Sequence, residues 1–249
     1  MTFTQQDFEN VLRSMGDITP GMSPPFPWPT IPCPDEVLSF GSLEVQDWSS
    51  AQRRTSQRAV IVVIESPHEK EFTFSTDNDW QANGPLQRRT SFLNHFKARV
   101  GNASGVSPDG FVFLINAVRF QCSLGKAMQG KEKVHRQNSK DRDARFRQCW
   151  ENGADQDFIE RITDIYRDDD VIVNACTGTQ FGVRRRNGGP PDDLKWMVEN
   201  AIMTALPNHR PPVAYRRGKK ERLLVSDIGT YHPCKWLGND REAIWPRSS

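Results

Sequence analysis

The feature that most constrains the fold is an apolar run at residues 59–65, of sequence AVIVVIE. A run of β-branched residues without alternation is typical of a strand that is buried on both faces of a parallel sheet. The run ends at Glu65, and a proline and a cluster of ionisable residues follow at 66–71 (SPHEKE). Ligands of open α/β sheets bind at the carboxyl ends of the strands. We therefore expect the functional site to lie where this strand ends.

Further apolar runs alternate with stretches of helical periodicity. The predicted strands are Phe111–Ala117, Val171–Cys176 and Arg222–Ile228. The predicted helices lie at 86–100, 141–166 and about 192–206, and a polar loop is expected at 73–83. This alternation predicts an α/β fold, a three-layer α/β/α sandwich with a short four-stranded parallel sheet. The domain is expected to span 59–249, with a basic, turn-rich insertion at about 119–147.

Residues 1–58 are expected to form an N-terminal helix and a proline-rich strap packed on that domain. The spacing of apolar residues predicts a helix over 4–15, with Thr4 as its N-cap. Seven prolines between Pro20 and Pro34 exclude a helix or a central strand there. Residues 35–58 are expected to be weakly helical.

Composition excludes several classes of protein. No apolar run approaches the roughly 18 residues that a membrane span needs, and the N-terminal stretch carries acids and no apolar signal region. Five cysteines without a CxxC pair argue against a disulfide framework and for a reducing compartment. We expect a cytoplasmic monomer.

Three motifs follow predicted strands in a fixed order. They are Glu65-Ser66-Pro67, the stretch FLINAV at 113–118 with Asn116, and Thr230-Tyr231-His232-Pro233-Cys234. This ordered set, together with VIVNACTG at 171–178, resembles the uracil-DNA glycosylase superfamily over about residues 59–240. The pattern is closest to the branch with Gly-Glu-Ala-Pro-Gly and Thr-Tyr-His-Pro-Ser motifs.

The resemblance implies hydrolysis of the N-glycosidic bond of a flipped-out pyrimidine in DNA, which leaves an abasic site. Glu65 would stabilise the oxocarbenium ion and orient a water molecule. The Asn116 amide, with one donor group and one acceptor, would read the Watson–Crick edge of the base. His232 would stabilise the departing base anion. These three residues are the predicted catalytic set.

The predicted base-binding residues are Ser66, Pro67, His68, Phe72 and Trp80. Ser66 stands where the best-known branch has a water-activating aspartate, so the carboxylate could be Glu65, Glu69 or Glu71. His68 stands where an aromatic residue of the uracil-specific branch blocks C5 substituents. We therefore expect a C5-modified pyrimidine, such as occurs in modified phage DNA, and a role in phage defence.

The resemblance also places the contacts to DNA. Trp236 lies where the family has a wedge residue that fills the gap left by the flipped base. The basic residues expected to neutralise DNA phosphates are Lys235, Arg184, Arg185, Arg186, Lys219 and Lys220.

No cofactor and no metal are expected. The iron–sulfur branch has four cysteine ligands, whereas here Cys122 and Cys149 fall near two of those positions and only Cys33 lies upstream. Two other functions stay open. One is a catalytically silent nucleic-acid-binding module that senses modified or single-stranded bases. The other, ranked last, is a metal-dependent nuclease or nucleotide hydrolase that uses Glu65, Glu69, Glu71 and Asp77.

Overall fold

The structure is a computed structural model. It describes residues 2–46, 53, 57–68, 71–77, 79–84, 106–123, 135–176, 194–209, 215–217, 220–222, 228–230 and 244–245. At 135–140 and in the four short segments after residue 209, the description covers the backbone only. The predicted helix at 86–100 lies outside the described residues.

The chain divides into two compact units. The first comprises Met1–Asp35, Ser66–Gln87 and Asn116–Glu160, and the second comprises Glu36–Glu65, Arg88–Ile115 and Arg161–Ser249. Each unit is described by itself below.

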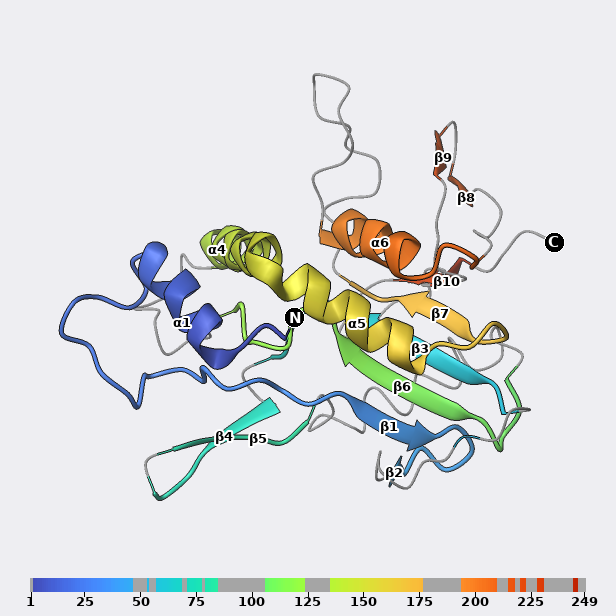
Figure 1. The fold of residues 1–249 in the computed structure, drawn as a ribbon, viewed down its shortest axis with the longest axis horizontal. Coiled ribbons are helices and arrows are strands. Elements are labelled where there is room, and N and C mark those ends of the chain that lie inside the picture. Colours follow the sequence, from blue (N-terminus) through green and yellow to red (C-terminus); the bar gives the residue numbers. More distant parts are fainter. Residues whose placement is uncertain are drawn as a thin grey trace. The chain divides into compact units, whose positions relative to one another are not determined.

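The second unit is built on a sheet whose strand order is β11-β10-β7-β3-β6-β1-β2 (Figure 1). Its centre is β3 (Ala59–Ile64), which pairs in parallel with β7 (Val171–Asn174). On its other side lies β6 (Phe111–Asn116). The amide of Phe111 donates to the carbonyl of Arg58 at 3.3 Å, so β3 and β6 start side by side and run in parallel. The strands predicted from these three apolar runs are confirmed.

The sheet is mixed, and it is wider than the expected set of four parallel strands. β1 (Glu36–Ser39) pairs antiparallel with β6 and with β2 (Val45–Gln46). β11 (Ile244–Trp245) pairs antiparallel with β10 (Ile228–Thr230). The expectation of weak helicity at 35–58 is therefore wrong for β1 and β2. β1 is stabilised by pairing with β6, and β2 by pairing with β1, rather than by local sequence preference.

The fourth predicted strand, at 222–228, lies largely outside the described residues. β9 (Lys220–Arg222) ends there and pairs with β8 (Tyr215–Arg217) in a separate two-stranded sheet. β10 begins at Ile228 and pairs in parallel with β7. A parallel strand therefore does follow this part of the chain, later than predicted.

Helix α6 (Leu194–Ala205) packs on β7 (Figure 1). Its Val198 and Ile202 are fully buried, as are Val60 to Val63 of β3. This agrees with the helix predicted at about 192–206. The apolar runs of the sequence thus form the core of the second unit.

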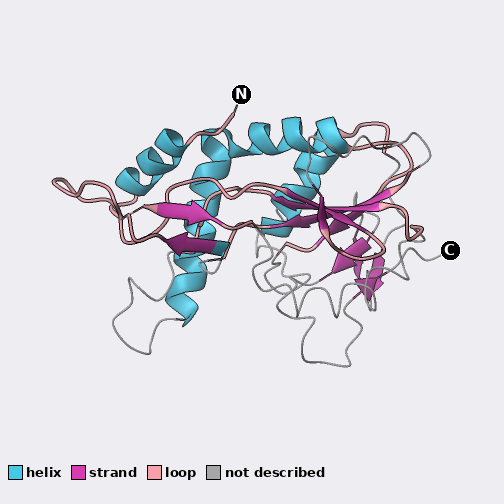
Figure 2. Ribbon diagram, turned by 90° about the horizontal axis from the view of Figure 1, so that it is seen from below, coloured by secondary structure: helices cyan, strands magenta, loops and turns pink. Residues whose placement is uncertain are grey.

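The first unit is mainly helical. α1 (Gln5–Ser14) has Thr4 as its N-cap, as predicted. α4 (His135–Cys149) continues through a π-helical turn (Trp150–Ala154) into α5 (Asp155–Ile165). The stretch expected to be turn-rich, 119–147, is helical from His135 on, and the helix predicted over 141–166 thus begins earlier than expected. Figure 2 shows these helices in cyan.

Aromatic side chains fill the core of the first unit. Phe120 stacks on Phe8 of α1 with ring centroids 4.9 Å apart, and Phe146 stacks on Trp150 at 5.3 Å. In the proline-rich strap, Phe26 and Trp28 are buried. The strap is therefore anchored by its aromatic residues.

The stretch predicted as a polar loop at 73–83 forms a hairpin instead. β4 (Phe72–Phe74) pairs antiparallel with β5 (Trp80–Ala82). Phe74 and Trp80 contact each other across the pair, with ring centroids 5.0 Å apart. Cross-strand aromatic pairs stabilise such two-stranded ribbons. The sequence did not predict these two strands because most residues of 73–83 are polar.

A buried ion pair holds the amino end of the sheet in the second unit. The Asp170 carboxylate, which precedes β7, pairs with the Arg53 guanidinium. It also accepts the amides of Ala59 at 2.9 Å and Arg167 at 2.9 Å. Ala59 is the first residue of β3, so one carboxylate joins the starts of the two central strands.

Among the described residues, no helix is both long enough and apolar enough to span a membrane.

We expect Asp170→Ala to lower the free energy of unfolding by about 3–5 kcal/mol, because it leaves the Arg53 charge buried without its partner. Urea denaturation followed by circular dichroism measures this loss. The control is Asp168→Ala, which changes an exposed side chain and should cost under about 0.5 kcal/mol. A loss below about 1 kcal/mol for Asp170→Ala would contradict the assigned role.

The cap of α1 makes a pH-dependent contribution. The Thr4 hydroxyl and amide donate to the Asp7 carboxylate at 2.6 and 2.8 Å, and they lower the pKa of Asp7 below its ordinary 3.8. The ionised carboxylate therefore stabilises the folded state above the unfolded pKa, and this contribution is lost as the pH falls through the folded pKa. We expect Thr4→Ala to cost about 1 kcal/mol near neutral pH.

We expect Asp7→Ala to be less stable than the wild type near neutral pH, and the difference to shrink below a pH of about 3. Thermal unfolding at both pH values measures this difference. Gln6→Ala is the control, because its exposed side chain bonds only to Asn10 among the described contacts. A difference that grows on acidification would contradict the assigned cap.

Candidate functional site

The strand order of the second unit contains a topological switch point. From β3 the chain continues to β6 on one side, and from β7 it continues to β10 on the other side. The connections thus lead from these two neighbouring strands to opposite sides of the sheet, and in open α/β sheets a crevice commonly lies outside the carboxyl ends of such strands. Ligands of open α/β sheets bind at such points. The ends of β3 and β7 are therefore where a site is expected.

Glu65 stands directly after β3 at this switch point. It follows a strand of six buried residues, and its own side chain is only 3 % exposed. Carboxylates are rarely buried without a compensating interaction, because removing the charge from water is costly. Of the sequence-predicted site residues, Glu65 is the one that the structure places at the switch point within the second unit.

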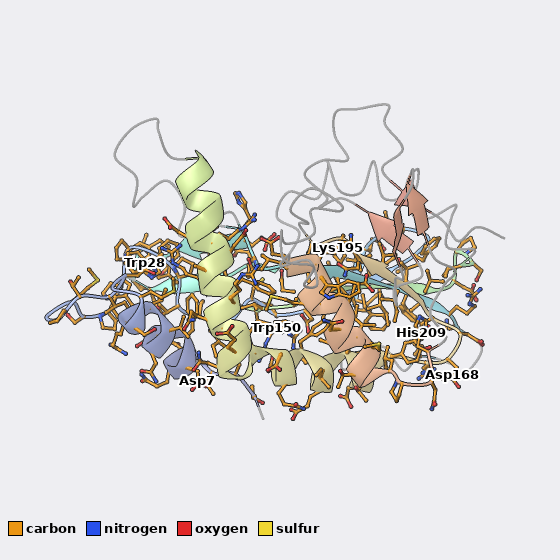
Figure 3. The ribbon with its side chains drawn as sticks, turned by 90° about the horizontal axis from the view of Figure 1, so that it is seen from above. Asp7, Trp28, Trp150, Asp168, Lys195 and His209 are labelled. Carbon is orange, nitrogen blue, oxygen red and sulfur yellow. The ribbon has the colours of Figure 1, made fainter. Side chains whose placement is uncertain are left out.

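Three further polar side chains are buried at the carboxyl end of β7. Asn174 is the last residue of β7, and it is fully buried. Lys195 and Glu199, one turn apart on α6, are 1 % and 2 % exposed. Figure 3 shows Lys195 at the start of α6. An amide, an ammonium group and a carboxylate therefore lie together next to the strand that ends in Glu65.

Hydrogen bonds connect this cluster. The Lys195 ammonium donates to the Asn174 carbonyl at 2.5 Å, and Asn174 Nδ2 donates to Glu199 Oε1 at 3.0 Å. Asn174 Nδ2 also contacts the Lys195 carbonyl at 3.2 Å. The Cys176 amide donates to Asn174 Oδ1 at 3.1 Å, which turns the chain away from the strand. We call Asn174, Lys195 and Glu199 the β7-end cluster.

Sequence reasoning missed the β7-end cluster. Lys195 and Glu199 are spaced four residues apart on a helix, a pattern that usually marks a solvated face. Only the interruption of the apolar run VIVNAC by Asn174 gave a signal, because a polar amide inside a buried strand needs a partner. That partner comes from a helix 21 residues later in the chain.

Asn116 is the last residue of β6, at the boundary of the first unit, and it is fully buried. The sequence analysis predicts an amide at a strand end for this position, and the structure has one. Leaving a buried amide unpaired costs roughly 1–3 kcal/mol. A buried amide at the end of a strand is therefore a candidate for a specific role.

Ser66, Pro67 and His68 form the first part of the chain after Glu65, within the first unit. Pro67 is buried, Ser66 is partly exposed and His68 is exposed. The His68 amide donates to the Glu71 carboxylate at 3.1 Å, and the Glu71 amide donates to the His68 carbonyl at 2.9 Å. These two bonds join His68 to Glu71 just after the proline.

Phe72 and Trp80, the predicted stacking residues, both lie in the β4–β5 hairpin of the first unit. Phe72 is buried. Trp80 is partly exposed, and its indole N–H donates to the Phe26 carbonyl at 2.9 Å. Phe74 is the more exposed aromatic residue of the hairpin. The proline-rich strap therefore holds Trp80 in place through this hydrogen bond to Phe26.

Within the described part of the chain, no group of three His, Cys, Asp or Glu residues is arranged to hold a metal ion. Glu69, one member of the acidic set considered for a nuclease, lies outside that part. Cys33, Cys122, Cys149 and Cys176 are free thiols, and all four are buried.

The remaining predicted site residues are not described. His232, Lys235, Trp236, Arg184, Arg185, Arg186 and Lys219 lie outside the described residues, and Lys220 is described only as backbone of β9. The predicted roles of these residues in base release and DNA binding stay predictions.

No protein-family model, no curated protein and no solved structure matches this chain. The resemblance to the uracil-DNA glycosylase superfamily therefore stays a prediction from the strand-end motifs.

The burial of the thiols gives a direct test of the site's packing. Cys176 follows β7 at the switch point, with its Sγ 3.8 Å from the Val63 carbonyl. We expect at most one of the five thiols to react rapidly with an aromatic disulfide reagent in the native protein, and all five after denaturation. Rapid reaction of two or more native thiols would contradict this packing.

Proposed function

We propose that the protein is a monofunctional DNA glycosylase that hydrolyses the N-glycosidic bond of a flipped-out pyrimidine and leaves an abasic site. The observation that carries the proposal is a buried carboxylate, Glu65, directly after β3 at the switch point of the sheet. Cleavage of the bond builds positive charge on the sugar. A carboxylate held in a poorly solvated place stabilises that charge far better than one in water.

Burial favours Glu65 over Glu71, the other candidate glutamate that the structure describes. Glu71 lies in the first unit, and its carboxylate accepts the His68 amide at 3.1 Å. That bond gives Glu71 a local role in holding the main chain at His68. Glu65 has the position at the strand end that ligand sites of α/β sheets use.

Asn116 and His232 complete the proposed set. Asn116 ends β6 with a buried amide, which suits a group that must present a fixed donor and acceptor to a base. His232 comes two residues after the end of β10, which runs parallel to β7. An imidazole that follows this strand would act on the leaving base.

The proposal includes a finer view of the fold. We propose that the parallel strands β10, β7, β3 and β6 are the catalytic sheet of a three-layer α/β/α sandwich, and that β1, β2 and β11 extend it. We further propose that the protein acts as a cytoplasmic monomer on DNA. The basic residues Arg184 to Arg186, Lys219, Lys220 and Lys235 would then neutralise phosphates, with Trp236 as the wedge.

The proposed substrate is a pyrimidine substituted at C5, as in modified phage DNA. The basis is His68, which stands where the resemblance places a blocking aromatic residue and which is exposed. An exposed imidazole leaves more room for a substituent than a packed aromatic ring does.

Release of free base from a panel of DNAs, measured in the presence of a chelator, tests the proposal. The panel holds uracil, thymine mismatches, 5-hydroxymethylcytosine and glycosylated cytosine. We expect release from a C5-substituted base, slowed about 100-fold or more by His232→Ala and by Asn116→Ala. Asn200→Ala, at an exposed position of α6, is the matched control and should keep the wild-type rate.

Three outcomes would overturn parts of the proposal. Equal release of uracil without any release of substituted bases would remove the C5 preference. Salt-sensitive binding without release from any DNA would favour the silent binding module. Activity that disappears in chelator would favour the metal-dependent nuclease.

A further inference from the structure

The β7-end cluster is an unusual way to pack a helix on a sheet. Val198 and Ile202 already bury the apolar face of α6, so packing alone does not require charges there. Removing an ammonium group and a carboxylate from water is costly, and apolar side chains of similar volume often give an equal or greater stability. The presence of Lys195 and Glu199 therefore suggests a role other than stability.

Lys195, Glu199 and the Cys176 amide all form hydrogen bonds with Asn174. Lys195 binds its carbonyl, Glu199 binds its amide nitrogen, and the Cys176 amide binds its amide oxygen. Both the main chain and the side chain of the last residue of β7 are thus fixed by α6 and by the following turn. The end of a strand, which commonly frays, is held in one position here.

This fixed point is joined to β3 just before Glu65. Asn174 is the register partner of Val63, and the Ala175 amide donates to the Val63 carbonyl at 2.8 Å. Glu65 follows Val63 by two residues and comes directly after the last residue of β3. The end of β7 that α6 fixes is therefore hydrogen-bonded to β3 two residues before Glu65.

We infer that Asn174, Lys195 and Glu199 are positioning residues for Glu65. They fix the end of β7, and β7 in turn fixes the end of β3 from which the carboxylate projects. This inference rests on the proposed function, in which Glu65 must be held at the reacting sugar. A displacement on the order of 1 Å costs about 100-fold in rate, so such support has a measurable effect.

The test separates positioning from stability. The double variant Lys195→Met with Glu199→Leu replaces both buried charges by apolar side chains of similar length. We expect it to fold with an unchanged or higher melting temperature, and to release base about 10- to 100-fold more slowly at saturating DNA. Its DNA affinity should stay within about threefold of the wild-type value, because the side chains of the cluster are buried and present no charge to a ligand.

Two control variants are made in the same helix. Val198→Ala loosens the packing of α6 without touching the cluster, so it should lower the melting temperature and keep the rate within about threefold. Glu199→Gln keeps an acceptor for Asn174 Nδ2 and should also keep most of the rate. If the double variant releases base at the wild-type rate, or if Val198→Ala is equally slow, the inference is wrong.

A second readout does not depend on catalysis. The carboxyl carbon signal of Glu65 is observed by nuclear magnetic resonance in protein labelled at glutamate, and Glu65→Gln assigns it. We expect this signal to shift in the double variant but not in Glu199→Gln or in Val198→Ala. An unchanged signal in the double variant overturns the inference. If wild-type protein releases no base but the signal shifts as expected, the proposed function fails and the positioning of Glu65 stands.

Discussion

The parallel pairing of β3 with β7 is the interaction on which the second unit depends. All residues of both strands are buried, so their main-chain groups have no access to water and must bond to neighbouring strands. The register runs from Val60 opposite Val171 to Val63 opposite Asn174. A shift by one residue would exchange the two faces of either strand. The same register therefore determines which polar residues lie at the ends of β3 and β7.

The two ends of β7 carry different kinds of polar support. At the amino end, Asp170 joins the starts of β3 and β7 through an ion pair with Arg53 and two main-chain amides. At the carboxyl end, Asn174 is held by α6, next to the strand that leads to Glu65. Binding sites of such sheets lie at the carboxyl ends of strands. We therefore interpret the first network as structural and the second as support for a site.

Long-range pairing explains what the sequence could and could not predict. The strands at 59–65, 111–117 and 171–176 were predictable because each is a continuous apolar run, and α1 was predictable from its periodicity and cap. The pairs β1–β2 and β4–β5 were missed because their strands are two to four residues long. Such short strands are stabilised by their neighbours, which no local pattern reveals.

The candidate site likewise has some residues that local sequence predicts and others that only long-range contacts explain. The positions of Glu65 and Asn116 at strand ends were predictable because each ends an apolar run with a polar side chain. Lys195 was not, since a lysine on a helix normally faces solvent. Its burial follows from a contact with Asn174, a residue distant in the sequence. A polar residue that interrupts a buried strand thus indicates that a partner exists, but not which residue the partner is.

The central claim is that the Glu65 carboxylate, at the switch point of the sheet, stabilises the positive charge that builds on the sugar when the N-glycosidic bond is cleaved. The most direct measurement compares the single-turnover rate of base release by Glu65→Gln and Glu71→Gln, two isosteric changes that each remove one negative charge. The account predicts that Glu65→Gln slows release by about 100-fold or more with DNA affinity unchanged, whereas Glu71→Gln keeps the wild-type rate. Wild-type release by Glu65→Gln would contradict the account, most clearly if Glu71→Gln were inactive.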